Sequence, residues 1–228
     1  MNFFDSAIVH GLNALAGRSN AFDAAIHALA DLPLIKGGAL AALLWAAWFR
    51  PTANRTRNRE LVLATIAATV TSLVLTKVVR HFLPLRLRPL HDPALDFIVP
   101  HGVAADSLWN WSSFPSDTAA MVFALAGGLL LIDRRWGVLA LIYSLFVVCL
   151  PRVYLGYHYP TDVIAGAFVG VSIAALMGWR MVRRPLARPL LAWGNKHPGA
   201  FYALLFIATY EIASVFENAR RVITFVIH

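Results

Sequence analysis

Residues 152–162 read Arg-Val-Tyr-Leu-Gly-Tyr-His-Tyr-Pro-Thr-Asp and lie between two hydrophobic stretches of the chain. This segment places a cation (Arg152), an imidazole (His158) and a carboxylate (Asp162) close together. A guanidinium presents a planar set of N–H donors that suits a phosphate. An imidazole can act as a nucleophile, and a carboxylate can orient it and stabilise its positive charge. Charged groups at the edge of a membrane are costly, so this cluster indicates a functional site.

The composition indicates a membrane protein. Of 228 residues, 59% are hydrophobic and 14% are charged, which is more apolar than soluble domains are. Because lipid offers no hydrogen bonds to the backbone, we expect an all-α, polytopic helical bundle. Residues 1–228 would form a single membrane domain. The lone Cys149 lies in an apolar run, which excludes a disulfide framework and a cysteine metal site.

Hydropathy predicts about six transmembrane helices. Two short interfacial helices, at 3–16 and 21–30, would precede them within residues 1–31, and residues 217–228 would form a C-terminal tail. The predicted spans are 32–49, 60–82, 115–132, 136–155, 160–181 and 198–216, which together make a bundle over residues 32–216.

Charge predicts how the bundle is oriented. Arginines follow the first, third and fifth spans, and positive residues in short loops stay cytoplasmic. The formal net charge of +8 is thereby explained without nucleic acid as a partner. The loops 83–114 and 151–160 would then face outward. We expect a multi-pass protein of the bacterial cytoplasmic (inner) membrane with its site facing the periplasm or exterior.

The first outward loop carries two further motifs. Arg86 and Arg88, stiffened by neighbouring prolines, could converge on one anion, or they could bind lipid headgroups. The loop ends Phe-Pro-Ser-Asp-Thr at 114–118, directly before the third span. Ser116 or Asp117 could cap that helix, and the helix N-terminus would then attract an anion. An ordinary capped helix is the alternative.

The order and sidedness of these three segments resemble the type 2 phosphatidic acid phosphatase superfamily. Its motifs are Lys-x6-Arg-Pro, Pro-Ser-Gly-His and Ser-Arg-x5-His-x3-Asp, and the resemblance covers roughly residues 77–170. The chain looks most like members with Arg-x-Arg-Pro and Phe-Pro-Ser-Asp variants, which include undecaprenyl-diphosphate phosphatases. The resemblance implies that Arg88, Arg152 and Ser116 bind phosphate, that His158 becomes phosphorylated and that Asp162 orients it. It also implies that no metal or other cofactor is needed.

Three departures from the family motifs change the chemical expectation. The family lysine falls at His81, although Lys77 lies one helical turn earlier and could take its place. The serine before Arg152 is replaced by Pro151. The histidine that ends the second motif, which protonates the leaving group in the family, is Thr118, and threonine cannot supply a proton near neutral pH.

The loss of this acid points to a diphosphate substrate. A general acid contributes about 10²–10⁴ in rate. An alkoxide leaving a phosphomonoester needs that proton, whereas the phosphate leaving a diphosphate is a much weaker base. His81, His91 and His101 are candidate substitute acids, and the sequence does not choose among them.

The predicted function is therefore a membrane lipid phosphatase that acts on a polyprenyl diphosphate or related lipid phosphate through a phosphohistidine. Two alternatives remain open. The same phosphohistidine could transfer its group to a sugar or lipid acceptor, or the chain could be a non-catalytic lipid-diphosphate binder that lacks the acid histidine. The sequence does not determine the exact lipid, the acceptor or the oligomeric state.

Overall fold

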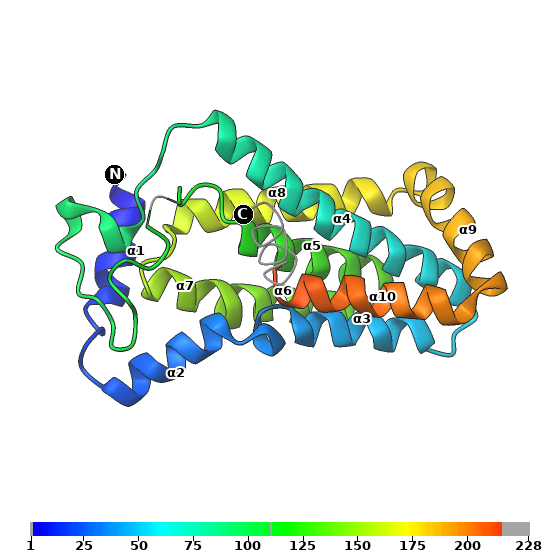
Figure 1. Ribbon diagram of the computed structural model, residues 1–228, viewed down its shortest axis with the longest axis horizontal. Helices are drawn as coiled ribbons and strands as arrows, with labels where there is room; N and C mark the ends of the chain where they lie inside the picture. Colours follow the sequence, from blue (N-terminus) through cyan, green and yellow to red (C-terminus); the bar gives the residue numbers. More distant parts are fainter. Residues whose placement is uncertain (1, 110, 216–228) are drawn as a thin grey trace, which may run out of the picture.

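The computed structural model describes residues 2–109 and 111–215, and within these ranges it is helical, with no strand (Figure 1). The all-α prediction is confirmed there, while the predicted tail 217–228 lies outside the described residues. The elements are α1 (Phe3–Asn13), α2 (Asn20–Asp31), the π-helix η1 (Leu34–Gly38), α3 (Ala39–Phe49), α4 (Arg55–Phe82), the short 3₁₀ turns η2 (Pro89–His91) and η3 (Pro93–Leu95), α5 (Asp117–Ile132), α6 (Arg134–Tyr143), the π-helix η4 (Ser144–Cys149), α7 (Leu150–Tyr154), α8 (Pro160–Gly178), α9 (Arg180–Lys196) and α10 (Pro198–Ala213).

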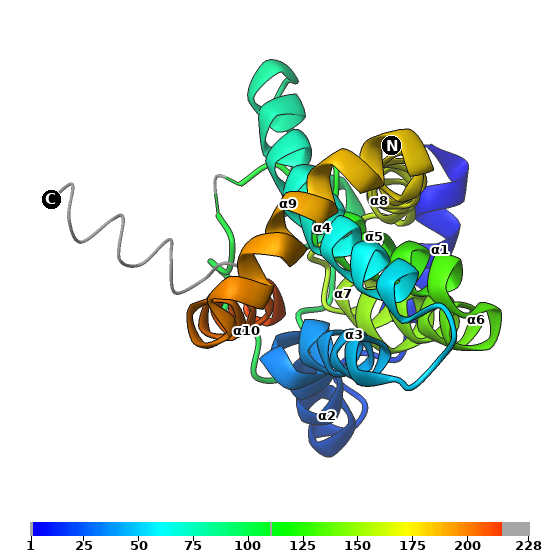
Figure 2. The ribbon, with the colours of Figure 1, turned by 90° about the vertical axis from the view of Figure 1, so that its right-hand side faces the viewer.

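Helix α5 forms the centre of the bundle and packs against α4, α6 and α8 (Figure 2). Glycines of α8 allow its backbone to approach α5 closely. A Cβ added at Gly166 would lie 2.3 Å from the carbonyl oxygen of Ser116, and one at Gly170 would lie 2.3 Å from that of Ala120. The approach joins the first turns of the two helices, where the Ser116 N–H donates to the Asp162 carbonyl oxygen at 3.1 Å.

Three helical segments are long and apolar enough to cross a membrane: α4, the continuous α6–η4–α7 segment and α8. A fourth is added if α2 and Leu34–Phe49, which are bent by 55° relative to each other, form one broken span. The apolar helices α5 and α10 have 16 residues each. That length corresponds to about 24 Å, which is short of a hydrocarbon core of about 30 Å. The structure thus shows a multi-pass helical bundle but does not confirm the count of six.

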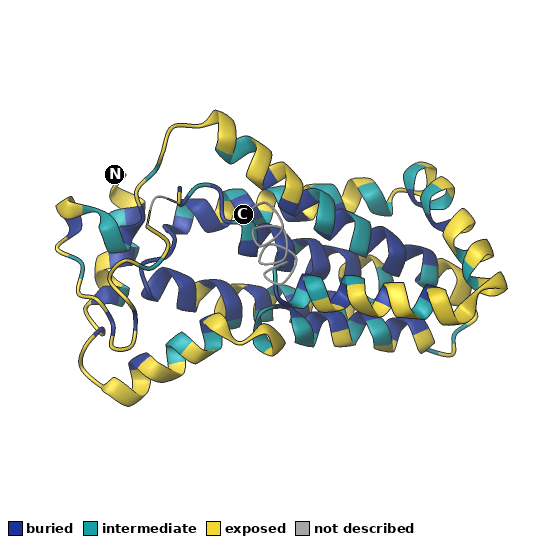
Figure 3. Cartoon of the chain, viewed as in Figure 1, coloured by how far each residue is buried: buried dark blue, intermediate teal, exposed yellow. Residues whose placement is uncertain are grey.

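Exposed residues lie along the outside of the bundle helices (Figure 3), and many of them are large and apolar. Phe168, Leu139 and Phe206 are each more than 60% exposed. Large exposed apolar areas of this kind mark contact with lipid or a partner, and lipid is the simpler explanation for helices of this hydropathy.

The arginine-rich segment after the fifth predicted span was expected to be a loop, but it forms helix α9. Two prolines, Pro185 and Pro189, lie inside it and argue against a helix. A buried ion pair holds the segment in place, because Arg183 Nε lies 3.1 Å from Glu60 Oε2 at the start of α4. This basic helix lies at one end of the molecule, and α1 with the loop after α4 lies at the other (Figure 1).

Candidate active site

His158 lies in the turn between α7 and α8 and is only 1% exposed. Its Nδ1 is 2.9 Å from the carbonyl oxygen of Ser113. Because a carbonyl can only accept a hydrogen bond, Nδ1 carries the proton and Nε2 keeps its lone pair. The tautomer therefore leaves Nε2 as the nucleophilic atom.

Asp162 lies in the first turn of α8 and is fully buried. Its Oδ2 accepts the Tyr159 backbone N–H at 2.7 Å, which caps the helix. The same oxygen lies 3.8 Å from His158 Nδ1. The carboxylate therefore acts on the imidazole through its charge, while the direct hydrogen-bond partner is the Ser113 carbonyl.

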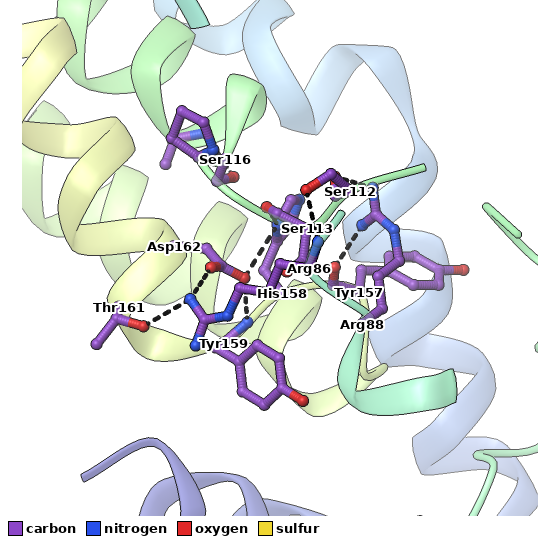
Figure 4. Close-up of polar contacts among 12 residues, drawn as sticks. Arg86, Arg88, Ser112, Ser113, Ser116, Tyr157, His158, Tyr159, Thr161 and Asp162 are labelled. Atoms are coloured by element: carbon purple, nitrogen blue, oxygen red, sulfur yellow. Dashed lines mark hydrogen bonds and ion pairs between the residues drawn. The ribbon is translucent and has the colours of Figure 1, made fainter. Parts of the chain in front are cut away.

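Arg86 lies between the buried carboxylates of Asp5 and Asp162, and Figure 4 shows its contact with Asp162. Its Nη1 donates to Asp162 Oδ1 and to Thr161 Oγ1, and its Nη2 donates to Asp5 Oδ2 at 2.7 Å. The guanidinium also stacks over the Tyr159 ring at 4.3 Å. These contacts hold the Arg86 guanidinium against both carboxylates, whereas the sequence predicted that it would bind an anion together with Arg88.

Arg88 is 4% exposed and joins the loop between α4 and α5 to the His158 turn. It donates to the carbonyl oxygens of Trp111 at 3.1 Å, Ser112 at 3.4 Å and Tyr157 (Figure 4). A guanidinium has five N–H donors, so two remain for an anion.

Arg152, in α7, is also buried at 9% exposure. Its Nη1 donates to the Ala30 carbonyl oxygen at 3.3 Å. Its Nε is buried and has no hydrogen-bond partner in the described ranges 2–109 and 111–215. An unpaired buried donor costs stability, and a bound anion would remove that cost.

The charges of Arg88, Arg152 and Asp162 influence the pKa of His158. The pKa of His158 is lowered to about 4, mainly by burial and also by the charges of Arg88 and Arg152, while Asp162 opposes this shift. Burial also lowers the pKa of Arg88 to about 10, with the charge of Arg152 as the next cause. The imidazole is therefore neutral at pH 7, and a phosphate anion would relieve the repulsion among the cations.

The second motif forms the start of α5. Ser116 is its N-cap and accepts the Ala119 N–H at 3.3 Å. Asp117 accepts the Thr118 N–H at 2.8 Å and lies 3.7 Å from Arg80. Thr118 is 2% exposed, so the position of the family acid is inside the protein.

A cavity of about 490 Å³ lies beside this helix start, at the end of α4. Both candidates for the lysine role, Lys77 and His81, line it, and so does Arg80. Arg80 was not among the predicted site residues, although it directly precedes the motif position His81. The full lining is Lys77, Arg80, His81, Leu83, Leu85, Trp111 and Ser112.

The other two candidate acids have different surroundings. The Nε2 of His91 lies 2.9 Å from the Ser107 carbonyl oxygen, and its ring packs edge-on against Trp109. The backbone N–H of His101 donates to Asp23. Of the three histidines, His81 is therefore the one that lines the cavity.

A model of the PAP2 superfamily matches residues 59–185, more than half of the chain. The chain belongs to the PAP2 superfamily. The matched segment runs from the first turns of α4 into α9 and contains every predicted site residue.

PAP2 relatives with phosphatase names support this assignment. The undecaprenyl-diphosphatase BcrC of Bacillus subtilis (strain 168) is 28% identical over 177 residues, 77% of this chain and 82% of its own. The Escherichia coli (strain K12) protein YbjG is 29% identical over 156 residues, 68% of this chain and 72% of its own. The crystal structure of Aquifex aeolicus LpxE has the same fold, with a TM-score of 0.50 and 24% identity over 75% of this chain and 92% of that one.

Asp5 lies outside the segment matched to the PAP2 superfamily, yet it contacts the site. It is fully buried and accepts the Thr161 N–H at 2.9 Å and the Thr161 hydroxyl at 2.6 Å, besides Arg86. This contact could not be predicted from an acidic residue on a short N-terminal helix, because the partners of Asp5 lie far away along the chain.

Proposed function

We propose that this PAP2 protein is an integral membrane lipid phosphatase that removes the terminal phosphate of a polyprenyl diphosphate or a related lipid phosphate. The observation that carries the proposal is a buried His158 whose Nδ1 lies 2.9 Å from the Ser113 carbonyl oxygen, which leaves Nε2 with its lone pair within reach of the charges of Arg88 and Arg152. The undecaprenyl-diphosphatase name of the Bacillus subtilis relative supports the substrate class.

The chemistry proceeds in two steps. His158 Nε2 attacks the terminal phosphorus, and the bond to the bridging oxygen breaks with its electron pair on the departing lipid phosphate. Water then attacks the phosphohistidine, which releases inorganic phosphate and restores the imidazole. Arg88, Arg152 and the first amides of α5 balance the charge on the transferred group without a metal. Asp162 stabilises the imidazolium character of the intermediate.

Thr118 sets the preference for a diphosphate. With no acid at this position, a leaving alkoxide would depart unprotonated, whereas a leaving phosphate is stable as an anion. We therefore expect faster phosphate release from polyprenyl diphosphate than from phosphatidate. The opposite order would refute this part of the proposal.

The proposed placement is a single membrane domain with six crossings in a bacterial cytoplasmic membrane. In this arrangement α5 and α10 complete the bundle, and the interfacial helices α1 and α2 lie at the outer surface with the site. Support comes from the arginines, which gather around α9 and the loops at the opposite end of the molecule.

A phosphate-release assay on the purified protein tests the function. The native protein should release phosphate from farnesyl diphosphate, and His158→Ala should abolish release because no other group carries the nucleophile. His197→Ala, at an exposed position between α9 and α10, is the matched control and should keep full activity.

The assay also separates the alternatives. Release that persists in His158→Ala would refute the mechanism. Lipid binding without turnover in either protein would indicate a non-catalytic binder. Labelled phosphate recovered on a sugar or lipid product by mass analysis would indicate a phosphotransferase.

A further inference from the structure

The end of α4 presents three basic side chains to one cavity. Lys77, Arg80 and His81 are spaced so that they share a helix face, and all three line the space of about 490 Å³. Lys77 and His81 are exposed, while the side chain of Arg80 is 13% exposed. A concentration of basic groups around an open space suits an anion.

Arg80 connects this cavity to the second motif. Its Nη2 donates to the Pro115 carbonyl oxygen at 3.0 Å and lies 3.7 Å from Asp117 Oδ2. Its Nε is buried without a hydrogen-bond partner in the part of the chain that the structure describes. The guanidinium therefore lies against the helix start that carries Thr118 and still has an unused buried donor.

Ser112 links the cavity to Arg88 of the His158 cluster. It lines the cavity, and its carbonyl oxygen accepts from Arg88. Asp117, the partner of Arg80, lies within the electrostatic reach of both His158 and Arg152. A substrate whose terminal phosphate is at His158 could thus extend its next phosphate toward Arg80.

The remaining wall of the cavity is apolar. Leu83, Leu85 and Trp111 are 41%, 58% and 49% exposed and line the same space. A wall that combines cations with exposed apolar side chains matches a phosphate that is attached to a hydrocarbon chain.

We infer that this cavity is the leaving-phosphate subsite and that Arg80 contacts the lipid-linked phosphate as it departs, so that a fixed positive charge replaces the missing proton donor at Thr118. The inference rests on the proposed phosphatase function. When the bond between the terminal phosphorus and the bridging oxygen breaks, its electron pair stays on that oxygen, and the departing lipid phosphate gains negative charge. Arg80 balances this charge, and no proton has to be transferred.

Two substrates isolate this role. Farnesyl diphosphate has a second phosphate for the subsite. p-Nitrophenyl phosphate has none, and its leaving anion needs no acid. Removing one group that stabilises a transition-state charge costs about 10²–10³ in rate. Arg80→Met should therefore lower kcat/KM for farnesyl diphosphate by about 100-fold and that for p-nitrophenyl phosphate by less than about 5-fold, and Arg80→Lys should recover part of the loss.

The matched control is Arg55→Met, at the exposed opposite end of the same helix. This variant should leave kcat/KM unchanged for both substrates. Equal losses on the two substrates in Arg80→Met would overturn the subsite while the phosphatase function stands. No phosphate release by the native protein from either substrate would instead overturn the proposed function.

Product inhibition provides a second test of the subsite. It uses substitutions of exposed residues, which the fold tolerates. The product farnesyl phosphate should compete with farnesyl diphosphate in the native protein. Lys77→Ala and His81→Ala should each weaken this inhibition several-fold. Inhibition that is unchanged in both variants would argue against the cavity as the product site.

Discussion

At the scale of single residues, the protonation state of His158 controls whether the site can react. Burial holds the pKa of this imidazole at about 4, so Nε2 has its lone pair throughout the neutral range and loses it only as the pH falls through that value. We expect the His158 ring signals in a histidine NMR titration to move near pH 4, well below the ordinary value of about 6.5. The kcat/KM for p-nitrophenyl phosphate should fall on the same acid limb.

The His158→Ala variant identifies the signal, because only that resonance should disappear. A titration centred near pH 6.5 would contradict the buried, cation-surrounded environment. The NMR measurement is needed beside kinetics because kcat/KM also reports ionisation of the free substrate.

The residue scale also shows where sequence reasoning stops. His158, Arg88 and Arg152 could be chosen from their spacing and chemistry, and the structure brings them together. The Ser113 carbonyl, which fixes the tautomer, could not be chosen, because every residue has a carbonyl and its direction depends on the fold. Arg86 looked equivalent to Arg88 in the sequence, but the carboxylates of Asp5 and Asp162 engage it.

At the scale of elements, α1 belongs to the active-site structure. Arg86 forms ion pairs with both Asp5 and Asp162. If the Asp5 charge were removed, Asp162 would be the one carboxylate paired with this guanidinium. Asp5→Asn keeps an oxygen that can accept from Thr161. We expect it to lower kcat by about 10-fold, because a hydrogen bond to a charged group contributes about 1.5–3 kcal/mol and Arg86 passes only part of that to Asp162. It should also shift the His158 titration to lower pH, because nearby positive charge disfavours the imidazolium.

Asp31→Asn, at the exposed end of α2, is the control for Asp5→Asn. It should change neither kcat nor the pH at which His158 titrates. A purely structural role for Asp5 would reduce the amount of folded protein without moving the titration of the folded fraction. An unchanged kcat and titration in folded Asp5→Asn would show that α1 does not position the site.

Local signals explain which elements were predictable. Helix α8 begins at Pro160 as expected, because proline favours the first turn of a helix, and Ser116 caps α5 as one of two proposed residues. Helix α9 was missed because its stability comes from the Arg183–Glu60 pair, which joins segments 123 residues apart. The α5–α8 contact depends on Gly166 and Gly170, and the sequence does not reveal which backbone approaches them.

At the scale of the whole molecule, the two ends differ in charge and in chemistry. The buried His158 cluster and the cavity lie at the end that contains α1 and the loop after α4, while the arginines of α9 and the loops beside it occupy the other end (Figure 1). Because arginine-rich loops remain cytoplasmic, this separation supports the proposed placement of the site at the outer face, where a lipid diphosphate would enter from the outer leaflet.

Single-cysteine labelling tests that orientation. Ala94→Cys places an exposed thiol in the loop near the site, and Ala53→Cys places one between α3 and α4 at the opposite end. The natural Cys149 is buried and should stay unlabelled, which the unsubstituted protein verifies. A membrane-impermeant maleimide added to intact cells should label Ala94→Cys and should reach Ala53→Cys only after permeabilisation. The reverse pattern would move the His158 site to the cytoplasmic face, and the positive-inside argument would then fail for this chain.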